Sequence, residues 1–314
     1  MTSVSNDNGR AFEYVIVLGL KKHLESLGID YLETERTTVD NSRDMLKLKE
    51  LPEAKQKDFI LAASKFLEWV DSEGWFIGAD KITIDRLPDK EGQRNNVTDI
   101  ELKIEKGEDI EQKNISVKHN HDALKHPRLP NLVAQCGIED ETIDRLWREN
   151  HDAIWTEFNR KSKDLKADAK TFKELKDIDN SFIDKNLYKP LIDAVIKFLK
   201  ENVKDNPDKV KSFFNFLTSD MDFYTVKNER LKVIIKKFLD ITPPTVMNIE
   251  YPYLQRLNTF KITFDNDWEM TLRLHTASSR MYKSVRLINT SSKLDVMCIN
   301  LDDLIDMEHI DKSN

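Results

Sequence analysis

The sequence predicts an α+β fold, with helices and strands grouped in separate stretches of the chain. Apolar residues recur at helical spacing near the start, and apolar and polar residues alternate strictly from residue 97 to 104. A charged stretch with helical spacing then covers residues 139–239, before alternation returns. With 314 residues, 39% of them hydrophobic and 33% charged, the chain has the composition of a globular protein.

Two amphipathic helices are expected in the first quarter of the chain. The first runs over about residues 9–27 with Asp7 as its cap, and the second over about residues 52–71. Glu13 stands three, four and seven residues before apolar positions of the first helix. This spacing places its carboxylate at the edge of the apolar stripe rather than on the solvent face.

Strands are expected next, and two of them form a hairpin. A short strand covers residues 81–85, and the hairpin joins residues 97–104 to residues 114–118 through a loop that contains Gly107. The helical stretch that follows is broken at Asn206-Pro207 and ends at Pro243-Pro244.

One face of the hairpin carries groups that suit phosphodiester hydrolysis. Asp99 and Glu101 project from its first strand, and Ser116 and Lys118 project from its second, so a carboxylate and an ammonium come close together. Glu13 could add a further carboxylate. Hydrolysis of a phosphodiester needs Mg²⁺ held by carboxylates and a group that positions the nucleophile. The alternative is a solvated strand face with an ordinary Asp and Lys pair.

A basic run rich in histidine follows Lys118 directly and holds three of the seven histidines. We favour a loop that donates to DNA phosphates; a zinc site, which lacks a fourth ligand, and an ordinary polar loop are the alternatives. The candidate DNA-binding residues of this run are His119, Asn120, His121, Lys125, His126 and Arg128.

The C-terminal segment is a second candidate for DNA contact, although the net charge is −7. No acid lies between Glu269 and Asp295, and five Lys or Arg residues do. Arginine matches the O6 and N7 atoms of guanine, whereas the alternative is a basic strand packed beside the acidic helical region. The candidates here are Arg273, His275, Ser278, Ser279, Arg280 and Lys283.

Several classes are disfavoured. Cys136 and Cys298 are far apart and lack the spacing of a disulfide framework or a cysteine zinc site. No apolar run is long enough for a membrane span and no signal pattern starts the chain, so a cytoplasmic location is expected.

Three separated motifs carry a family resemblance. Residues 9–14 (GRAFEY), residues 115–129 (ISVKHNHDALKHPRL) and residues 272–280 (LRLHTASSR) resemble the HaeIII-type restriction endonuclease family in the same order. The resemblance implies a restriction-endonuclease-like core, a mixed sheet flanked by helices with a PD-(D/E)xK centre. In this interpretation residues 1–135 are the catalytic core, residues 136–245 a helical region, and residues 246–314 a β segment for DNA recognition.

The resemblance also implies roles at the centre. Asp99 would bind Mg²⁺ together with the carbonyl of Val117, and Lys118 would orient or activate the attacking water. Ser116 stands where the family pattern usually has an acid, and Thr98 stands where a proline often precedes the aspartate. Glu13 and Glu101 are the candidates for the second carboxylate; we favour Glu13, because its place on an apolar stripe is otherwise costly.

The expected function is that of a type II restriction endonuclease. It would cut duplex DNA at a short palindrome, with GGCC favoured, by in-line attack of a metal-activated water that leaves 5′-phosphate ends. A palindrome favours a homodimer on DNA. A repair or recombination nuclease of the same fold and a non-catalytic DNA-binding protein are the alternatives.

Overall fold

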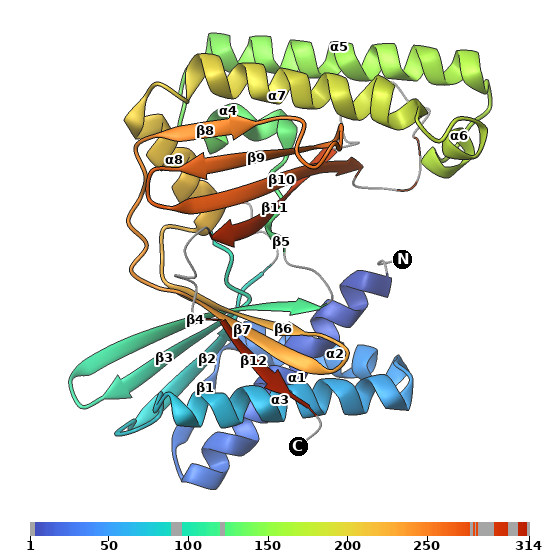
Figure 1. Cartoon of the computed structure of the whole chain (residues 1–314). Helices are drawn as coiled ribbons and strands as arrows, with labels where there is room; N and C mark the ends of the chain where they lie inside the picture. Colours follow the sequence, from blue (N-terminus) through green and yellow to red (C-terminus); the bar gives the residue numbers. More distant parts are fainter. Residues whose placement is uncertain are drawn as a thin grey trace. The chain divides into compact units, whose positions relative to one another are not determined.

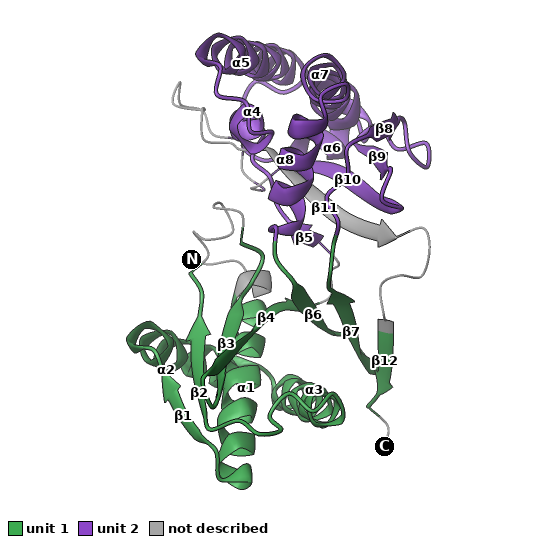
Figure 2. Ribbon diagram, turned by 90° about the vertical axis from the view of Figure 1, so that its left-hand side faces the viewer, with its two compact units in different colours: residues 1–122, 221–241, 303–314 green, residues 123–220, 242–302 purple. Residues whose placement is uncertain are grey.

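A computed structural model describes residues 4–88, 96–119, 123–276, 279, 281, 292–300 and 307–312. The chain forms two compact units (Figure 2). Unit 1 comprises residues 1–122, 221–241 and 303–314, and unit 2 comprises residues 123–220 and 242–302. Segments from the predicted helical region and from the C-terminal segment therefore belong to unit 1.

Unit 1 is built on a seven-stranded sheet of order β1-β2-β3-β4-β6-β7-β12. The pairs β1/β2 and β4/β6 are parallel and the other neighbours are antiparallel, so the sheet is mixed. Its strands are β1 (Asp30–Glu33), β2 (Lys81–Arg86), β3 (Ile100–Lys106), β4 (Asp109–His119), β6 (Phe223–Asn228), β7 (Lys232–Phe238) and β12 (Met307–Asp311). With the helices described next, this architecture confirms the predicted α+β class.

Three helices pack on this sheet (Figure 1): α1 (Val4–Leu27), α2 (Glu35–Glu50) and α3 (Glu53–Ser72). Apolar side chains of α1 and α3 share one core with alternate residues of the strands, including Ile100, Leu102 and Val117. Burial of this apolar surface is the main term that holds the helices to the sheet. The polar side chains at alternate positions are left for the opposite face.

Unit 2 has an antiparallel sheet of order β5-β11-β10-β9-β8, covered by helices. Phe214 of α8 packs edge-on against Phe264 and Trp268 of the sheet. The strands are β5 (Ala123–Lys125), β8 (Met247–Glu250), β9 (Thr259–Phe264), β10 (Trp268–Thr276) and β11 (Ser292–Asn300). The helices are α4 (Leu132–Gln135), α5 (Glu141–Leu165), α6 (Phe172–Ile178), α7 (Lys189–Asn202) and α8 (Pro207–Thr218), with short turns η2 (Leu129–Asn131) and η3 (Asp184–Tyr188).

The hairpin, α1 and α3 were predicted correctly, with shifted ends, whereas α2 was not predicted. β3 begins at Ile100 rather than at residue 97, and β4 already begins at Asp109. Because α1 begins at Val4, Asp7 lies inside its first turn and is not its cap. Asp7 instead pairs with Lys47 of α2, with 3.0 Å between Oδ1 and Nζ.

The prediction of helix up to residue 239 was wrong at its end. β6 and β7 occupy residues 223–238 and extend the sheet of unit 1. All six side chains of β6 are buried, so this strand lacks the alternation that identifies a half-exposed strand. None of the described helices is long and apolar enough to cross a membrane.

Candidate active site

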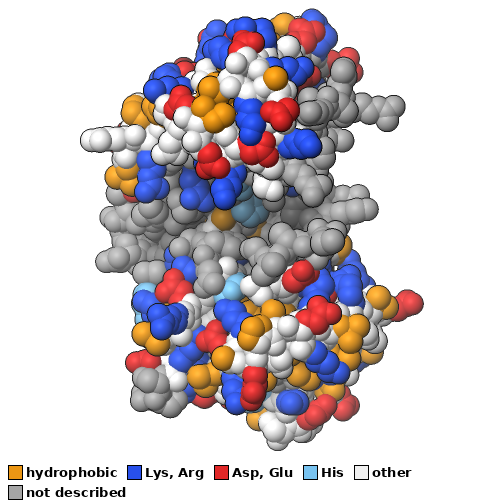
Figure 3. Space-filling model, turned by 90° about the vertical axis from the view of Figure 1, so that its right-hand side faces the viewer, with side chains coloured by type: hydrophobic (Ala, Val, Ile, Leu, Met, Phe, Trp, Pro, Cys, Tyr) orange, Lys and Arg blue, Asp and Glu red, His pale blue; other side chains and the backbone are white. Residues whose placement is uncertain are grey.

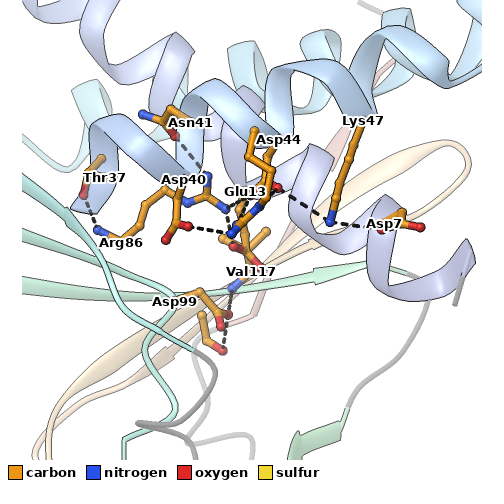
Figure 4. Close-up of polar contacts among 12 residues, drawn as sticks. Asp7, Glu13, Thr37, Asp40, Asn41, Asp44, Lys47, Arg86, Asp99 and Val117 are labelled. Carbon is orange, nitrogen blue, oxygen red and sulfur yellow. Dashed lines mark hydrogen bonds and ion pairs between the residues drawn. The ribbon is translucent and has the colours of Figure 1, made fainter. Parts of the chain in front are cut away.

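Asp99 lies where β3 and β4 begin to diverge. Its backbone N donates to the carbonyl of Ile115 at 2.9 Å, which is the last rung before the ladder opens. Beyond that rung the Asp99 side chain takes the place of a backbone acceptor, and its Oδ2 accepts from the N–H of Val117 at 2.7 Å. The hairpin therefore holds this carboxylate between its two strands (Figure 4).

Ser116 and Lys118 of β4 both reach the same oxygen of Asp99. The hydroxyl of Ser116, which is fully buried, donates to Oδ2 at 3.2 Å. Nζ of Lys118 lies 3.7 Å from Oδ2, an ion-pair distance longer than a hydrogen bond. The ammonium therefore stands beside the carboxylate with donors available for a further acceptor.

Glu13 reaches this region from α1. Its side chain is 19% exposed, and its Oε2 accepts from Nη2 of Arg86 at 2.7 Å. Burial and the negative charge of Asp99 raise the pKa of Glu13 to about 7, against the opposing charge of Arg86. Glu13 on α1 and Asp99 at the opening of the hairpin lie in the same region of unit 1 (Figure 4).

Arg86 ends β2 and belongs to a buried polar cluster that was not predicted. Its guanidinium also donates to Asp44 at 2.9 Å and to Asn41 at 3.0 Å, both on α2 (Figure 4). Arg86 is 1% exposed and Asp44 has no exposed surface. Burial alone would raise the pKa of Asp44, but the hydrogen bond from Arg43 and the charge of Arg86 outweigh burial and lower it.

Glu101 lies apart from this cluster. Its Oε1 pairs with Nζ of Lys103 at 3.1 Å, and its Oε2 accepts from Gln112 at 2.7 Å, both on the same hairpin. Both oxygens therefore have partners on the hairpin. Of the two candidates for a second carboxylate, the geometry favours Glu13.

Comparisons with known proteins agree with this geometry. The family model of the HaeIII restriction endonuclease matches residues 9–239, most of the chain. The chain belongs to the HaeIII restriction endonuclease family. It is 22% identical to the type II restriction enzyme HaeIII of Haemophilus aegyptius over 333 aligned positions, which cover 96% of each chain. No solved structure matches it significantly. As a member of this family the protein is a type II restriction endonuclease, an enzyme that acts on double-stranded DNA.

Restriction endonucleases of type II generally use divalent metal ions, and the donors of unit 1 fit such an ion. In the described part of the chain no three acidic, His or Cys side chains form a metal cluster. Mg²⁺, however, needs only one or two carboxylates because it keeps waters and binds substrate phosphate. Hydrogen bonds from the described residues reach Oδ2 of Asp99 and Oε2 of Glu13, and none reaches the second oxygen of either group. Each carboxylate therefore has one oxygen fixed by the protein and one left for a cation.

The basic run after Lys118 is placed only in part, since Asn120 and His121 lie outside the described residues. The ring of His119 packs edge-on against Phe59, and burial followed by the charge of Lys55 lowers its pKa to about 4. A neutral imidazole at neutral pH supplies no charge to a phosphate.

In unit 2, Lys125 does not lie where the prediction of a phosphate ligand requires. It is 3% exposed, and its Nζ donates to the carbonyl of Phe216 at 2.5 Å. All three residues of β5, including Lys125, are buried. His126 is exposed and Arg128 half-buried, which leaves both as candidates.

Part of the C-terminal candidate segment forms β10. Arg273, His275 and Thr276 of this strand are half-buried, and Arg273 and His275 alternate with the buried Leu272 and Leu274. The backbone carbonyl of Ser279 accepts from Phe172 at 3.1 Å, which connects this segment to α6. Three further candidates lie outside the described residues: Ser278, Arg280 and Lys283.

Charges of both signs are interspersed on the face drawn in Figure 3, over unit 1 and over unit 2. On this face Lys and Arg side chains are mixed with Asp and Glu, in keeping with a net charge of −7. The contacts of Arg86 were missed because they are distant in sequence. Arg86 is 73 residues from Glu13 and 42 residues from Asp44. The available signal was an apolar helix stripe with a carboxylate beside it, which implies a buried cationic partner.

Proposed function

We propose that the chain cuts both strands of duplex DNA at a short palindrome by hydrolysis at the centre formed by Glu13, Asp99 and Lys118. The observation that carries this proposal is the contact of Lys118 with Asp99 at 3.7 Å, at the opening of the hairpin and within electrostatic reach of Glu13. A carboxylate pair beside an ammonium is the donor set that phosphodiester hydrolysis needs.

Asp99 and Glu13, with the carbonyl of Val117, would hold Mg²⁺ in this proposal. Bound there, the ion would stabilise charge on the phosphate and lower the pKa of water. Ser116 and the N–H of Val117 keep the Asp99 carboxylate in place through Oδ2. Lys118 donates from Nζ to the attacking water and orients it in line with the scissile bond, which leaves 5′-phosphate and 3′-hydroxyl ends.

Sequence reading is assigned to unit 2 in the same proposal. Arg273 and His275 of β10 are offered as base readers, together with Ser279 and Arg280, and GGCC is the favoured target because of the family. An arginine fork suits the O6 and N7 atoms of guanine. His126 and Arg128 remain candidates for phosphate contact. Asn120 and His121 of the same run also remain candidates, whereas His119 would contact a phosphate only as a neutral imidazole.

Cleavage of a plasmid of known sequence tests this proposal. Wild-type protein with Mg²⁺ is expected to give discrete fragments whose ends, once sequenced, share one site. Lys118→Ala should lower the cleavage rate by about 100-fold or more, because the water loses its orienting group. The matched control is Lys103→Ala, which removes an exposed lysine that pairs with Glu101 on the same hairpin.

Three results would contradict the proposal: no cleavage by the wild type, full activity of Lys118→Ala, or fragments without a common site. The last of these would instead support a nuclease that recognises DNA structure or ends. Loss of cutting in EDTA and its return with Mg²⁺ alone would support Mg²⁺ as the cofactor.

A further inference from the structure

Arg86 joins two helices of unit 1 through one buried guanidinium. Nη2 donates to Glu13 of α1 at 2.7 Å and to Asp44 of α2 at 2.9 Å, while Nη1 donates to Asn41 of α2 at 3.0 Å (Figure 4). The backbone N–H of Arg86 donates to Oγ1 of Thr37 at 2.7 Å. Side chains of α2 therefore fix this residue at its backbone and at both terminal nitrogens.

Asp44 of α2 has two further cationic partners besides Arg86. Asp44 accepts from Nε and Nη2 of Arg43 at 2.9 and 3.0 Å, and Lys47 lies 3.6 Å away. Both cations are more exposed than Arg86, and each has another carboxylate partner: Arg43 pairs with Asp40 at 2.9 Å and Lys47 with Asp7 at 3.0 Å. Arg86 is thus the buried cation that Asp44 and Glu13 share.

Stability alone is a weak reason for this arrangement. A buried ion pair offsets its own desolvation only in part, and apolar side chains of the same volume often serve a core as well or better. Here Arg86 pairs with Glu13, whose pKa is raised by the charge of Asp99, and the hydrogen bond from Arg86 uses only Oε2 of Glu13. A free glutamate side chain beside a second carboxylate would rotate away from it, whereas the guanidinium keeps Glu13 in place.

We propose that Arg86 is a positioning residue which holds Glu13 toward Asp99, and that Asn41 and Asp44 of α2 hold Arg86 so that this network sets the affinity of the centre for its divalent cation. The inference rests on the proposed function, because it takes Glu13 and Asp99 as the carboxylates of the centre. Arg86 itself touches neither substrate nor cation.

Binding of Mn²⁺, measured by electron paramagnetic resonance of the free ion, tests the proposal without cleavage. Arg86→Lys keeps the charge but loses the planar fork, whose Nη2 reaches Glu13 and Asp44 while Nη1 reaches Asn41, so one shorter ammonium does not reproduce all three contacts. We expect it to weaken Mn²⁺ binding by about tenfold or more, as loss of a group that orients a ligand does. The Mg²⁺ concentration for half-maximal cleavage should rise in parallel, with the rate at saturating Mg²⁺ much less affected.

The matched control is Arg36→Lys. Arg36 is an exposed arginine of α2 that pairs with Asp85, the residue before Arg86, at 3.2 Å. Its replacement should leave Mn²⁺ binding unchanged, although it alters the same helix and the same strand. Far-ultraviolet circular dichroism and thermal unfolding establish that each variant is folded.

A milder variant keeps the proposal testable if Arg86→Lys does not fold. Asn41→Ala removes one hydrogen bond to Arg86 and leaves every charge in place, so a weakening of Mn²⁺ binding by a few-fold is expected. Asn41 also donates to Glu33 at 2.6 Å. Glu33→Ala, which removes that bond without touching Arg86, is its control and should bind Mn²⁺ as the wild type does.

Glu13→Gln separates the two levels of the argument. If Glu13→Gln weakens Mn²⁺ binding and folded Arg86→Lys and Asn41→Ala do not, the positioning role is overturned while the proposed centre stands. If Glu13→Gln and Asp99→Asn both bind Mn²⁺ and cut DNA like the wild type, the proposed centre is wrong and the inference falls with it. Weakening by Arg86→Lys but not by Arg36→Lys supports the inference.

Discussion

Buried charged residues occur in both units, but their surroundings differ. Arg86 of unit 1 has carboxylate partners, whereas Lys125 of unit 2 has the carbonyl of Phe216 and the face of its ring, 4.1 Å from Nζ. Burial lowers the pKa of Lys125 to about 7. A carbonyl and a ring thus replace the hydration of this ammonium only in part.

The free energy of unfolding should depend on pH through Lys125. In the unfolded chain Lys125 keeps its proton up to about pH 10.5, whereas in the folded chain Lys125 loses its proton near pH 7. Below pH 7 Lys125 is protonated in both states, and burial of its charge lowers the free energy of unfolding by the full amount. As pH rises toward 10.5 the folded state holds Lys125 neutral, and the free energy of unfolding increases. Relative to Lys125→Met, the wild type should gain up to about 1.4 kcal/mol per pH unit between pH 7 and 9.

Urea unfolding of the two proteins at several pH values measures this difference. Exposed Lys197→Met, which removes a lysine from α7 that is 73% exposed, is the control and should show no such slope. Parallel stabilities of the wild type and Lys125→Met across this range would mean that Lys125 keeps an ordinary pKa and is not buried as described.

At the scale of elements, the sequence predicted the parts of the site that depend on local pattern. Alternation placed Asp99 and Lys118 on one face of the hairpin, since the two strands are close in the chain, and the family resemblance then singled out these two residues. The position of Glu13 on α1 was also visible as a break in an apolar stripe. Local pattern could not show that Arg86 of β2 links these elements, because that contact depends on how α1 and α2 cross the sheet.

The interior strand β6 was harder to predict than the hairpin strands β3 and β4. β6 has no exposed face, so its sequence shows neither period, and a charged helical stretch precedes it directly. β4 nevertheless pairs with β6 in parallel, with Lys118 opposite Lys227 and Ser116 opposite Thr225. The strand that carries Ser116 and Lys118 therefore has as its neighbour in the sheet a segment about 100 residues later in the chain.

Arg273, a half-buried residue of β10, leads to a prediction about specificity. Arg273→Ala should relax or abolish the choice of site, with a cost of about 1–3 kcal/mol in discrimination if the residue reads guanine. Sequencing of all cut ends from a plasmid digest, with cleavage rates at the main site, measures both effects. Arg256→Ala, an exposed arginine in the connection between β8 and β9, is the control.

An unchanged set of cut sites and an unchanged rate in Arg273→Ala would remove this residue from base recognition. A uniformly slower digest with the same sites would indicate a phosphate contact instead, because phosphate contacts carry no sequence information. The register places Arg273 opposite Asp295 of β11, so loss of folding must be checked by thermal unfolding first.

At the scale of the whole molecule, each chain supplies one set of Glu13, Asp99 and Lys118, whereas a double-strand cut breaks two phosphodiester bonds. A palindromic site presents two identical half-sites, and a two-fold dimer offers the same surface to each. We therefore expect two chains on one duplex. The Lys118→Ala variant with Mg²⁺ should form this complex and cut it only slowly, and light scattering after size-exclusion chromatography gives its mass. A duplex in which GGCC is scrambled is the control and should bind more weakly.

One chain per duplex at saturation would contradict the dimer, because a single centre would then have to cut the two strands in succession. Successive cutting would be revealed by nicked plasmid that accumulates early in a wild-type digest.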